Sequence, residues 1–265
     1  MPDTQRPVDP AETARVVVKG VSHSFLTADG EARPALQGID LTVGSHEFVS
    51  LLGPSGCGKT TLLKIIGGLV ANTEGAVEID GGPVPQALRE RKFGFVFQDP
   101  TLLPWRTVIR NATLLLDTTG QPERREQVAA LLRTVGLEGF ENHYPAQLSG
   151  GMRQRVALAR ALALSPEILL MDEPFAALDA ITRERMAVEL LRIWDQSRTV
   201  VFVTHSIGEA VLLSDRVVVL SGRPGRILAD VPIDMPRPRG EEMRTTEQFV
   251  EYERLLRRHI EEAHA

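Results

Sequence analysis

The sequence contains a single cysteine, Cys57, so no disulfide can form within the chain. Its apolar runs are much shorter than the roughly 20 residues that a membrane-spanning helix needs. Basic residues are not in excess, because 30 lysines and arginines face 35 acidic residues and leave a net charge of −5. Proteins that bind nucleic acid usually carry a basic face. These shortages argue against a disulfide-bonded secreted protein, a membrane-embedded chain and a general nucleic-acid binder.

The first residues also lack the basic and then apolar stretches of a secretory signal. Residues 1–13 hold three prolines and no apolar periodicity, so we expect a flexible tail there. Together with the lone cysteine, the missing signal predicts a soluble chain that works in the cytoplasm. Hydrophobic residues make up 43% of the chain, which is enough to fill a substantial core.

Short apolar segments organise the rest of the chain. Residues 16–26 and 35–43 are β-rich and broken by glycine, which predicts an antiparallel sheet in an N-terminal subdomain. Farther on, strand and helix patterns alternate, as is typical of a mostly parallel sheet with helices on both faces. Between about residues 100 and 165 only helical patterns occur, which predicts an inserted α-helical subdomain. The fold class is therefore α/β.

We expect one main domain at residues 14–236 and a C-terminal helical extension at residues 237–265. No long internal repeat is visible, so the chain holds one such domain and not a fused pair. The extension has apolar residues at helical spacing, and we interpret them as packing on the chain's own domain rather than as a partner contact. These residues are Phe249, Tyr252, Leu256 and Ile260.

The stretch GPSGCGKTT matches the phosphate-binding P-loop pattern G-x-x-x-x-G-K-[S/T], which lies between a strand and a helix. Gly53, Gly58, Lys59 and Thr60 occupy its fixed positions. Its backbone N–H groups wrap a phosphate, the lysine adds a mobile positive charge, and the threonine hydroxyl can bind Mg²⁺. We interpret Cys57 as a small packing residue and not as a nucleophile. The predicted nucleotide contacts are Gly53, Pro54, Ser55, Gly56, Cys57, Gly58, Lys59, Thr60 and Thr61.

Polar residues follow three other strand-like segments. Asp172 and Glu173 come directly after the apolar run ILLM, where Asp172 can hold Mg²⁺ through water and Glu173 can orient or deprotonate an attacking water. His205 follows the next strand and can hydrogen-bond a transferring phosphate oxygen. Gln98 closes the strand FGFVFQ and can offer its amide to Mg²⁺ or to water. The candidate catalytic residues are Glu173, His205, Lys59 and Gln98, and the candidate metal ligands are Thr60, Gln98 and Asp172.

A second glycine-rich stretch, LSGGMRQR, precedes another predicted helix. Ser149, Gly150 and Gly151 would aim backbone N–H groups at an anion, by the same helix-end physics as the P-loop. One nucleotide has little need of two such sites.

In their order along the chain, these motifs resemble the ATP-binding cassette (ABC) family over roughly residues 15–236. The resemblance implies ATP and Mg²⁺ as cofactors and a homodimer joined head to tail. In that dimer, the γ-phosphate of ATP held by the partner's P-loop would be bound by the signature residues Ser149, Gly150 and Gly151. That arrangement accounts for the second anion site.

Further residues match the family one by one. Phe25 matches the aromatic residue that stacks on adenine, although a core role is the alternative, and Asp179 in AALD matches the aspartate that communicates across the dimer. Ala176 replaces a frequent serine and Met152 replaces a frequent glutamine, which affects the expected interface contacts and no catalytic group.

Two stretches, QDPTLLPWRTVIRN and VTHSIGEAVLLSDRVVVLSGRPGRI, resemble the nitrate, sulfonate and taurine importer subfamily. This implies a peripheral ATPase subunit on the cytoplasmic face of the inner membrane, with permease subunits as partners and an extracytoplasmic solute-binding protein that acts through them. An apolar patch would receive a short helix of the permease, unless it packs within the helical insert. It consists of Leu102, Leu103, Pro104 and Trp105.

Other functions remain open at this point. The chain can instead serve an exporter, a lipid-extraction system or a soluble non-transport process, although the LLPW and RPGRI segments favour an importer. A non-hydrolysing scaffold is disfavoured because Glu173 and His205 are both present. The solute itself leaves no pattern in this sequence.

Overall fold

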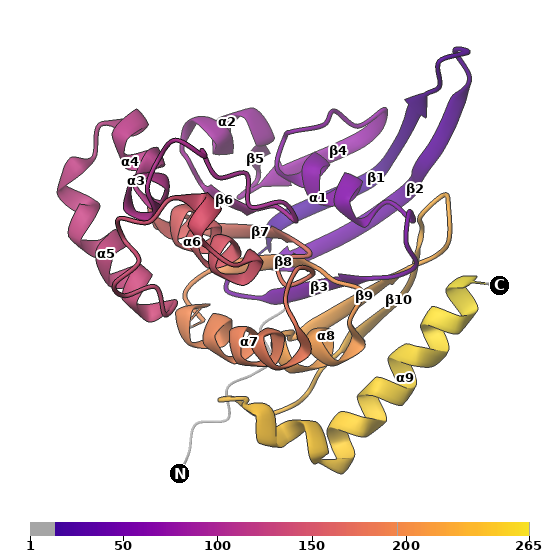
Figure 1. Ribbon diagram of the computed structural model, residues 1–265. Helices are drawn as coiled ribbons and strands as arrows, with labels where there is room; N and C mark the ends of the chain where they lie inside the picture. Colours follow the sequence, from indigo (N-terminus) through magenta and orange to yellow (C-terminus); the bar gives the residue numbers. More distant parts are fainter. Residues whose placement is uncertain (1–13, 195, 265) are drawn as a thin grey trace, which may run out of the picture.

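Two β-sheets of different character form the centre of the computed structural model (Figure 1). The structure describes residues 14–194 and 196–264, so the expected tail at residues 1–13 lies outside the described residues. The four-stranded antiparallel sheet has the order β2-β1-β4-β5, with β1 at Ala14–Leu26, β2 at Ala32–Gly44, β4 at Glu74–Ile79 and β5 at Gly82–Pro83.

The second sheet has six strands in the order β10-β9-β3-β8-β7-β6. All neighbouring strands in it are parallel except the edge strand β10, which is antiparallel to β9. Its strands are β3 at Phe48–Leu52, β6 at Phe93–Val96, β7 at Ile168–Asp172, β8 at Thr199–Val203, β9 at Arg216–Leu220 and β10 at Ile227–Pro232. The carboxyl ends of β3, β6, β7 and β8 therefore meet at one edge.

Helices cover both faces of the parallel sheet (Figure 1). Along β3, Phe48 and Leu52 face one core with side chains of α7 and α8, whereas Val49 and Leu51 face the other core with side chains of α1. Strands that are buried on both faces have sequences in which nearly every residue is apolar, and this explains the sequences of β3, β7 and β8. The flanking helices are α1 at Lys59–Ile66, α2 at Val84–Arg89, α7 at Ala180–Trp194 and α8 at Ile207–Leu213.

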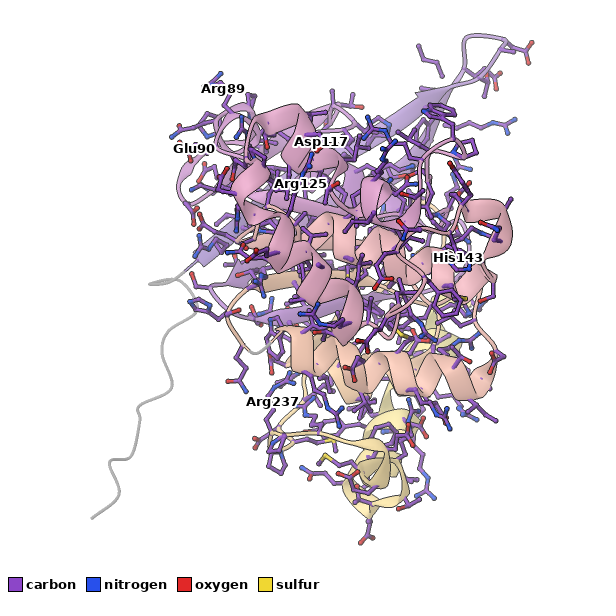
Figure 2. The ribbon with its side chains drawn as sticks, turned by 60° about the vertical axis from the view of Figure 1, so that its left-hand side comes forward. Arg89, Glu90, Asp117, Arg125, His143 and Arg237 are labelled. Carbon is purple, nitrogen blue, oxygen red and sulfur yellow. The ribbon has the colours of Figure 1, made fainter. Side chains whose placement is uncertain are left out.

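The chain between β6 and β7 contains helices and no strand, as the sequence predicts. These are α3 at Val108–Ala112, α4 at Leu114–Thr119, η1 at Pro122–Arg124, α5 at Arg125–Thr134, η2 at Pro145–Gln147 and α6 at Gly150–Leu162. An ion pair of 2.7 Å between Arg125 and Asp117 joins α4 to α5. Figure 2 labels both residues. The boundaries that we assign to this subdomain stay predictions.

The C-terminal extension contains η3 at Glu241–Thr245 and α9 at Glu247–His264. Phe249 and Leu256 on α9 are buried in the main core, and Tyr252 and Ile260 pack against it. The interpretation that this apolar stripe packs on its own domain is therefore confirmed. Among the residues that the structure covers, we find no helix with the length and apolar character to cross a bilayer.

Candidate active site

A cleft of about 240 Å³ opens at the carboxyl edge of the parallel sheet. Residues from the P-loop, from β1 and β2, from the turn after β7 and from the β9–β10 loop contribute to it. Its lining consists of Phe25, Ala35, Ser55, Gly56, Gly58, Lys59, Thr60, Thr61, Glu173 and Arg223. Most of the predicted nucleotide contacts therefore share one cleft.

The P-loop backbone depends on glycine at Gly58, which precedes α1. Its φ of 101° is left-handed, and an added Cβ would lie 2.9 Å from the carbonyl oxygen of Ala35. Cys57 beside it is 1% exposed, and burial raises the pKa of its thiol, as expected for a packing residue and not for a thiolate nucleophile. The loop is thus shaped by close packing against β2.

Lys59 is held inside the loop that precedes it. Its ammonium group donates hydrogen bonds to the carbonyl oxygens of Gly53 at 2.7 Å and Pro54 at 2.9 Å. The side chain is only 6% exposed, so these bonds compensate a positive charge that is largely removed from water. The charge is thereby fixed at the floor of the cleft.

Thr60 and Asp172 meet at the same place from different elements. The Thr60 hydroxyl donates a 2.7 Å hydrogen bond to Oδ1 of Asp172 at the end of β7. Burial raises the pKa of Asp172, and the Thr60 hydrogen bond opposes that shift. A hydroxyl and a carboxylate are oxygen ligands of the kind that Mg²⁺ prefers, so this pair fits the expected cation. In the described ranges, no group of three or more His, Cys, Asp and Glu side chains is arranged so that it could hold a metal ion.

Glu173 and His205 end neighbouring strands and face each other. Oε2 of Glu173 lies 3.3 Å from Nδ1 of His205, whose side chain is 56% exposed. Glu173 has a φ of 43°, a conformation that costs free energy in a residue other than glycine. The hydrogen bond from its N–H to the carbonyl of Val203 holds that turn against β8.

The structure does not bring Gln98 into this cleft. Its side chain is exposed after β6, and no hydrogen bond to it occurs within the described part of the chain. Its proposed contact with Mg²⁺ or water stays a prediction.

Phe25 and Arg223 line the outer part of the cleft. Phe25 is 44% exposed and contacts the ring of His23 edge-on, so it is not a core residue. Arg223 comes from the β9–β10 loop, which pairs with β2 through Gly225, and its Nε donates a 3.0 Å hydrogen bond to the carbonyl of Pro34. The sequence reasoning missed Arg223 as a site residue, although it noted the RPGRI segment.

The sequence profile of the ABC transporter family matches residues 36–176, which include the P-loop, the signature and the paired acids. The chain belongs to the ABC transporter family.

Similar proteins agree with this assignment. An uncharacterized ABC transporter ATP-binding protein of Methanocaldococcus jannaschii is 56% identical over 86% of this chain and 85% of that protein. The taurine import ATP-binding protein TauB of Yersinia pestis bv. Antiqua is 48% identical, over 77% of this chain and 81% of TauB. The aliphatic sulfonates import ATP-binding protein SsuB of Bacillus licheniformis is 47% identical, over 77% of this chain and 79% of SsuB.

A solved structure shares the fold. The dimeric structure of a post-hydrolysis state of an ATP-binding cassette bound to ADP and Pi superimposes with a TM-score of 0.75 at 37% identity. It covers 83% of this chain and 100% of that cassette. The α/β cassette fold, the ATPase class and the resemblance to taurine and sulfonate importer subunits are therefore confirmed.

The signature of this ABC cassette does not line the cleft formed by its own P-loop. Ser149 caps α6, because its Oγ accepts a 3.3 Å hydrogen bond from the N–H of Met152. An added Cβ on Gly151 would lie 2.7 Å from Cδ2 of Leu178, so the start of α6 packs tightly on the D-loop, residues 175–179. Asp179 accepts a 2.9 Å hydrogen bond from the N–H of Thr182 and thereby caps α7.

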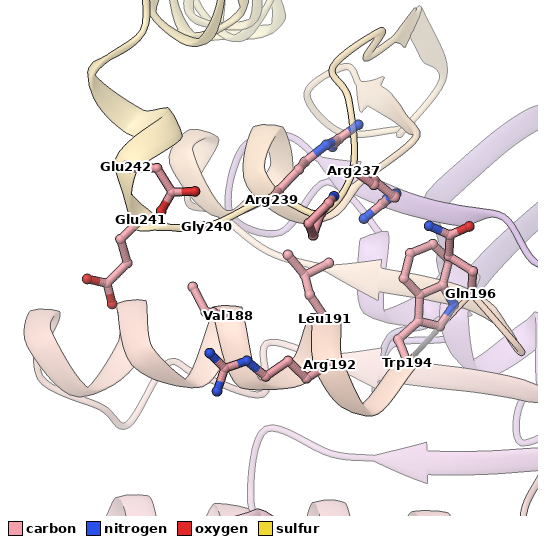
Figure 3. Close-up of a pocket in the computed structure, with 11 residues that line it drawn as sticks. Val188, Leu191, Arg192, Trp194, Gln196, Arg237, Arg239, Gly240, Glu241 and Glu242 are labelled. Atoms are coloured by element: carbon pink, nitrogen blue, oxygen red, sulfur yellow. The ribbon is translucent and has the colours of Figure 1, made fainter.

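A larger cavity of the ABC cassette, of about 730 Å³, lies between α7 and the segment that leads to η3 (Figure 3). Its arginines already have partners. Arg237 forms a 2.7 Å ion pair with Asp215 and lies 4.4 Å from the ring centre of Trp194. Arg239 donates to backbone carbonyls around the end of α8, including Ser214 at 2.6 Å. These contacts attach the C-terminal extension to the cassette.

Proposed function

We propose that this ABC ATPase is the energy-coupling subunit of an importer for a small solute of the sulfonate or taurine type, with nitrate as a further candidate. The observation that carries the proposal is the 47–48% identity to ATP-binding proteins named for taurine and aliphatic sulfonate import. The subunit would dock on permease subunits at the cytoplasmic face of the inner membrane. An extracytoplasmic solute-binding protein would deliver the solute.

The cleft supports in-line attack of water on the γ-phosphate of ATP. Phe25 would stack on adenine, and Lys59 would contact the phosphates. Glu173 would orient or deprotonate the water, and His205, held beside it, would hydrogen-bond the transferring group. When bound, Mg²⁺ would neutralise charge on the phosphate oxygens, with Thr60 and Asp172 as its protein ligands.

A second copy of the chain would complete the site. Ser149, Gly150 and Gly151 stand at a helix N-terminus outside their own cleft, so their N–H groups are free to bind a phosphate held by a partner. ATP would then join two chains head to tail, with Asp179 at their contact. Closure of that dimer would supply the motion that drives the permease.

The patch Leu102–Trp105 supports the membrane contact in part. Trp105 is 71% exposed, whereas Leu102 packs against the main core. Asn111, which is fully buried, fixes this loop, since its side chain accepts from the N–H of Leu103 and donates to the carbonyls of Leu103, Arg106 and Thr107. A rigid loop that presents one large aromatic side chain suits a hot spot for a permease helix.

Reconstitution with the cognate permease and solute-binding protein tests the proposal. We expect taurine or an alkanesulfonate to stimulate ATP hydrolysis and to enter the vesicles in an ATP-dependent way. Trp105→Ala should abolish co-purification with the permease, while Leu228→Ala, which removes an exposed apolar side chain from β10, should not. Export of a solute, or full hydrolytic function without any membrane partner, would favour the exporter or the soluble alternative.

A further inference from the structure

A carboxylate outside the proposed reaction is buried directly behind the histidine loop. Glu209, in the first turn of α8, is 5% exposed and lies outside the residues that line the cleft. Burial raises the pKa of its carboxyl, while a hydrogen bond from Thr204 and the charge of Arg183 oppose that shift. A buried carboxylate needs polar partners, so its partners show what it holds in place.

The first partners of Glu209 are Thr204 and Ser206, the residues on either side of His205 in the sequence. The Thr204 hydroxyl donates a 2.6 Å hydrogen bond to Oε2 of Glu209 and accepts a 3.0 Å hydrogen bond from the N–H of Ser206. Oγ of Ser206 in turn accepts a 3.3 Å hydrogen bond from the N–H of Glu209. Both chain neighbours of His205 are therefore tied to Glu209, and the direction of the histidine depends on that ring of bonds.

The second partner of Glu209 is Arg183, which also bonds the D-loop. Nε of Arg183, on the first turn of α7, lies 3.7 Å from Oε1 of Glu209. The same guanidinium donates to the carbonyl oxygens of Leu178 at 2.9 Å and Phe175 at 3.4 Å. Leu178 is also the side chain against which Gly151 packs. Arg183 thus connects the D-loop to the carboxylate of Glu209. The D-loop packs against the start of α6, and Glu209 bonds both chain neighbours of His205.

We propose that Glu209 and Arg183 are positioning residues that set the loop of His205 relative to the D-loop, and so couple the signature end of one chain to its own hydrolytic site. This inference rests on the proposed roles of Glu173 and His205. Neither positioning residue lines the cleft. They act by fixing where His205 meets Glu173.

The test uses the reconstituted complex with Glu209→Gln, Arg183→Gln and the double variant. Glutamine at position 209 keeps an acceptor for Thr204 and removes the charge that attracts Arg183. We expect kcat for ATP hydrolysis to fall about tenfold in each single variant while KM for ATP changes less than about twofold. Because the pair acts as a unit, the double variant should lose no more than either single one.

A matched control lies at the opposite edge of the sheet. Glu47 accepts a 2.6 Å hydrogen bond from Arg216, and Glu47→Gln removes a part-buried acidic partner of an arginine far from the cleft. It should keep the wild-type kcat even if its thermal stability falls. Arg183→Lys, which keeps a charge near Glu209, should recover part of the kcat lost in Arg183→Gln.

Other outcomes would overturn the inference. These are a wild-type kcat in both single variants, losses that add in the double variant, or a fall in kcat that is fully accounted for by a smaller folded fraction of the variant. Glu173→Gln and His205→Ala are measured alongside. If those two variants hydrolyse ATP at the wild-type rate, the proposed function fails; if they are inactive and Glu209→Gln is fully active, only the positioning role fails.

Discussion

Nδ1 of His205 lies 3.3 Å from Oε2 of Glu173, although the two residues are 32 positions apart in the sequence. The two side chains follow β8 and β7, which are adjacent parallel strands. A hydrogen bond from the N–H of Glu173 to the carbonyl of Val203 fixes the two strand ends together. The histidine is therefore held against the acid that lines the cleft, although His205 itself is not part of the lining.

Glu173→Gln should lower ATP hydrolysis by about 10²–10⁴-fold, because an amide cannot accept a proton from the attacking water. Nucleotide binding should remain, so light scattering with ATP should detect a trapped dimer. Glu189→Gln, which removes a partly exposed acid of α7 that pairs with Arg192 outside the cleft, is the control and should hydrolyse ATP normally. Wild-type hydrolysis by Glu173→Gln would show that another group activates the water.

The two signature glycines should respond differently to alanine. Gly151→Ala places a Cβ 2.7 Å from Leu178, so we expect a loss of about 1–3 kcal/mol in the free energy of unfolding. Gly150→Ala meets its nearest atom at 3.6 Å and should change stability by less than about 0.5 kcal/mol. If a partner's phosphate binds here, Gly150→Ala should still suppress hydrolysis. Denaturant unfolding and ATPase assays on both variants separate packing from phosphate binding.

Arg223→Ala should weaken ATP and ADP binding to a similar extent, roughly fivefold, which corresponds to about 1 kcal/mol. The reason is that Arg223 lines the outer cleft and not the catalytic end. Arg226, in the same loop, bonds Gln37 at 2.7 Å outside the cleft, so Arg226→Ala should bind nucleotide as the wild type does. Titration with a fluorescent nucleotide measures the affinity of both variants. If Arg223→Ala binds nucleotide as tightly as the wild type does, Arg223 is not part of the binding site.

The carboxyl of Glu47 should make the free energy of unfolding depend on pH. Burial raises the pKa of its carboxyl above the ordinary value near 4.3, so the folded state binds more protons than the unfolded state in that range. Its contribution to the free energy of unfolding must then fall as the pH rises through that range. Relative to Glu47→Gln, the wild type should therefore lose stability as the pH rises above about 4.3. Urea unfolding across that range checks the sign, and a constant difference would contradict it.

The sequence predicted those parts of the site that depend on local patterns. Lys59 and Thr60 follow from a motif of consecutive residues, and Asp172 and Glu173 follow from an apolar strand that must end at the ligand edge of a parallel sheet. His205 follows by the same argument one strand later. The helical insert was visible because its helices carry a period that differs from that of the strands.

Contacts between distant segments were not predictable in this way. Arg223 reaches the cleft only because the β9–β10 loop pairs with β2. The hydrogen bond from Arg223 to Pro34 joins residues that are 189 positions apart in the sequence. Gln98 shows the converse, since a residue that follows a strand at the same edge of the sheet can still lie outside the lining of the cleft. The cap that Asp179 provides to α7 was also missed, although aspartate is a common residue at helix starts.

The carbonyl oxygens that hold Lys59 also bear on product release. An ammonium group has three N–H donors, and two of them are bonded to Gly53 and Pro54, so an incoming phosphate exchanges acceptors rather than meeting an unpaired charge. When phosphate leaves, the same two carbonyls take the lysine back. The loop would thus stabilise the lysine charge in the discharged cassette and so reduce the free-energy cost of releasing the phosphate.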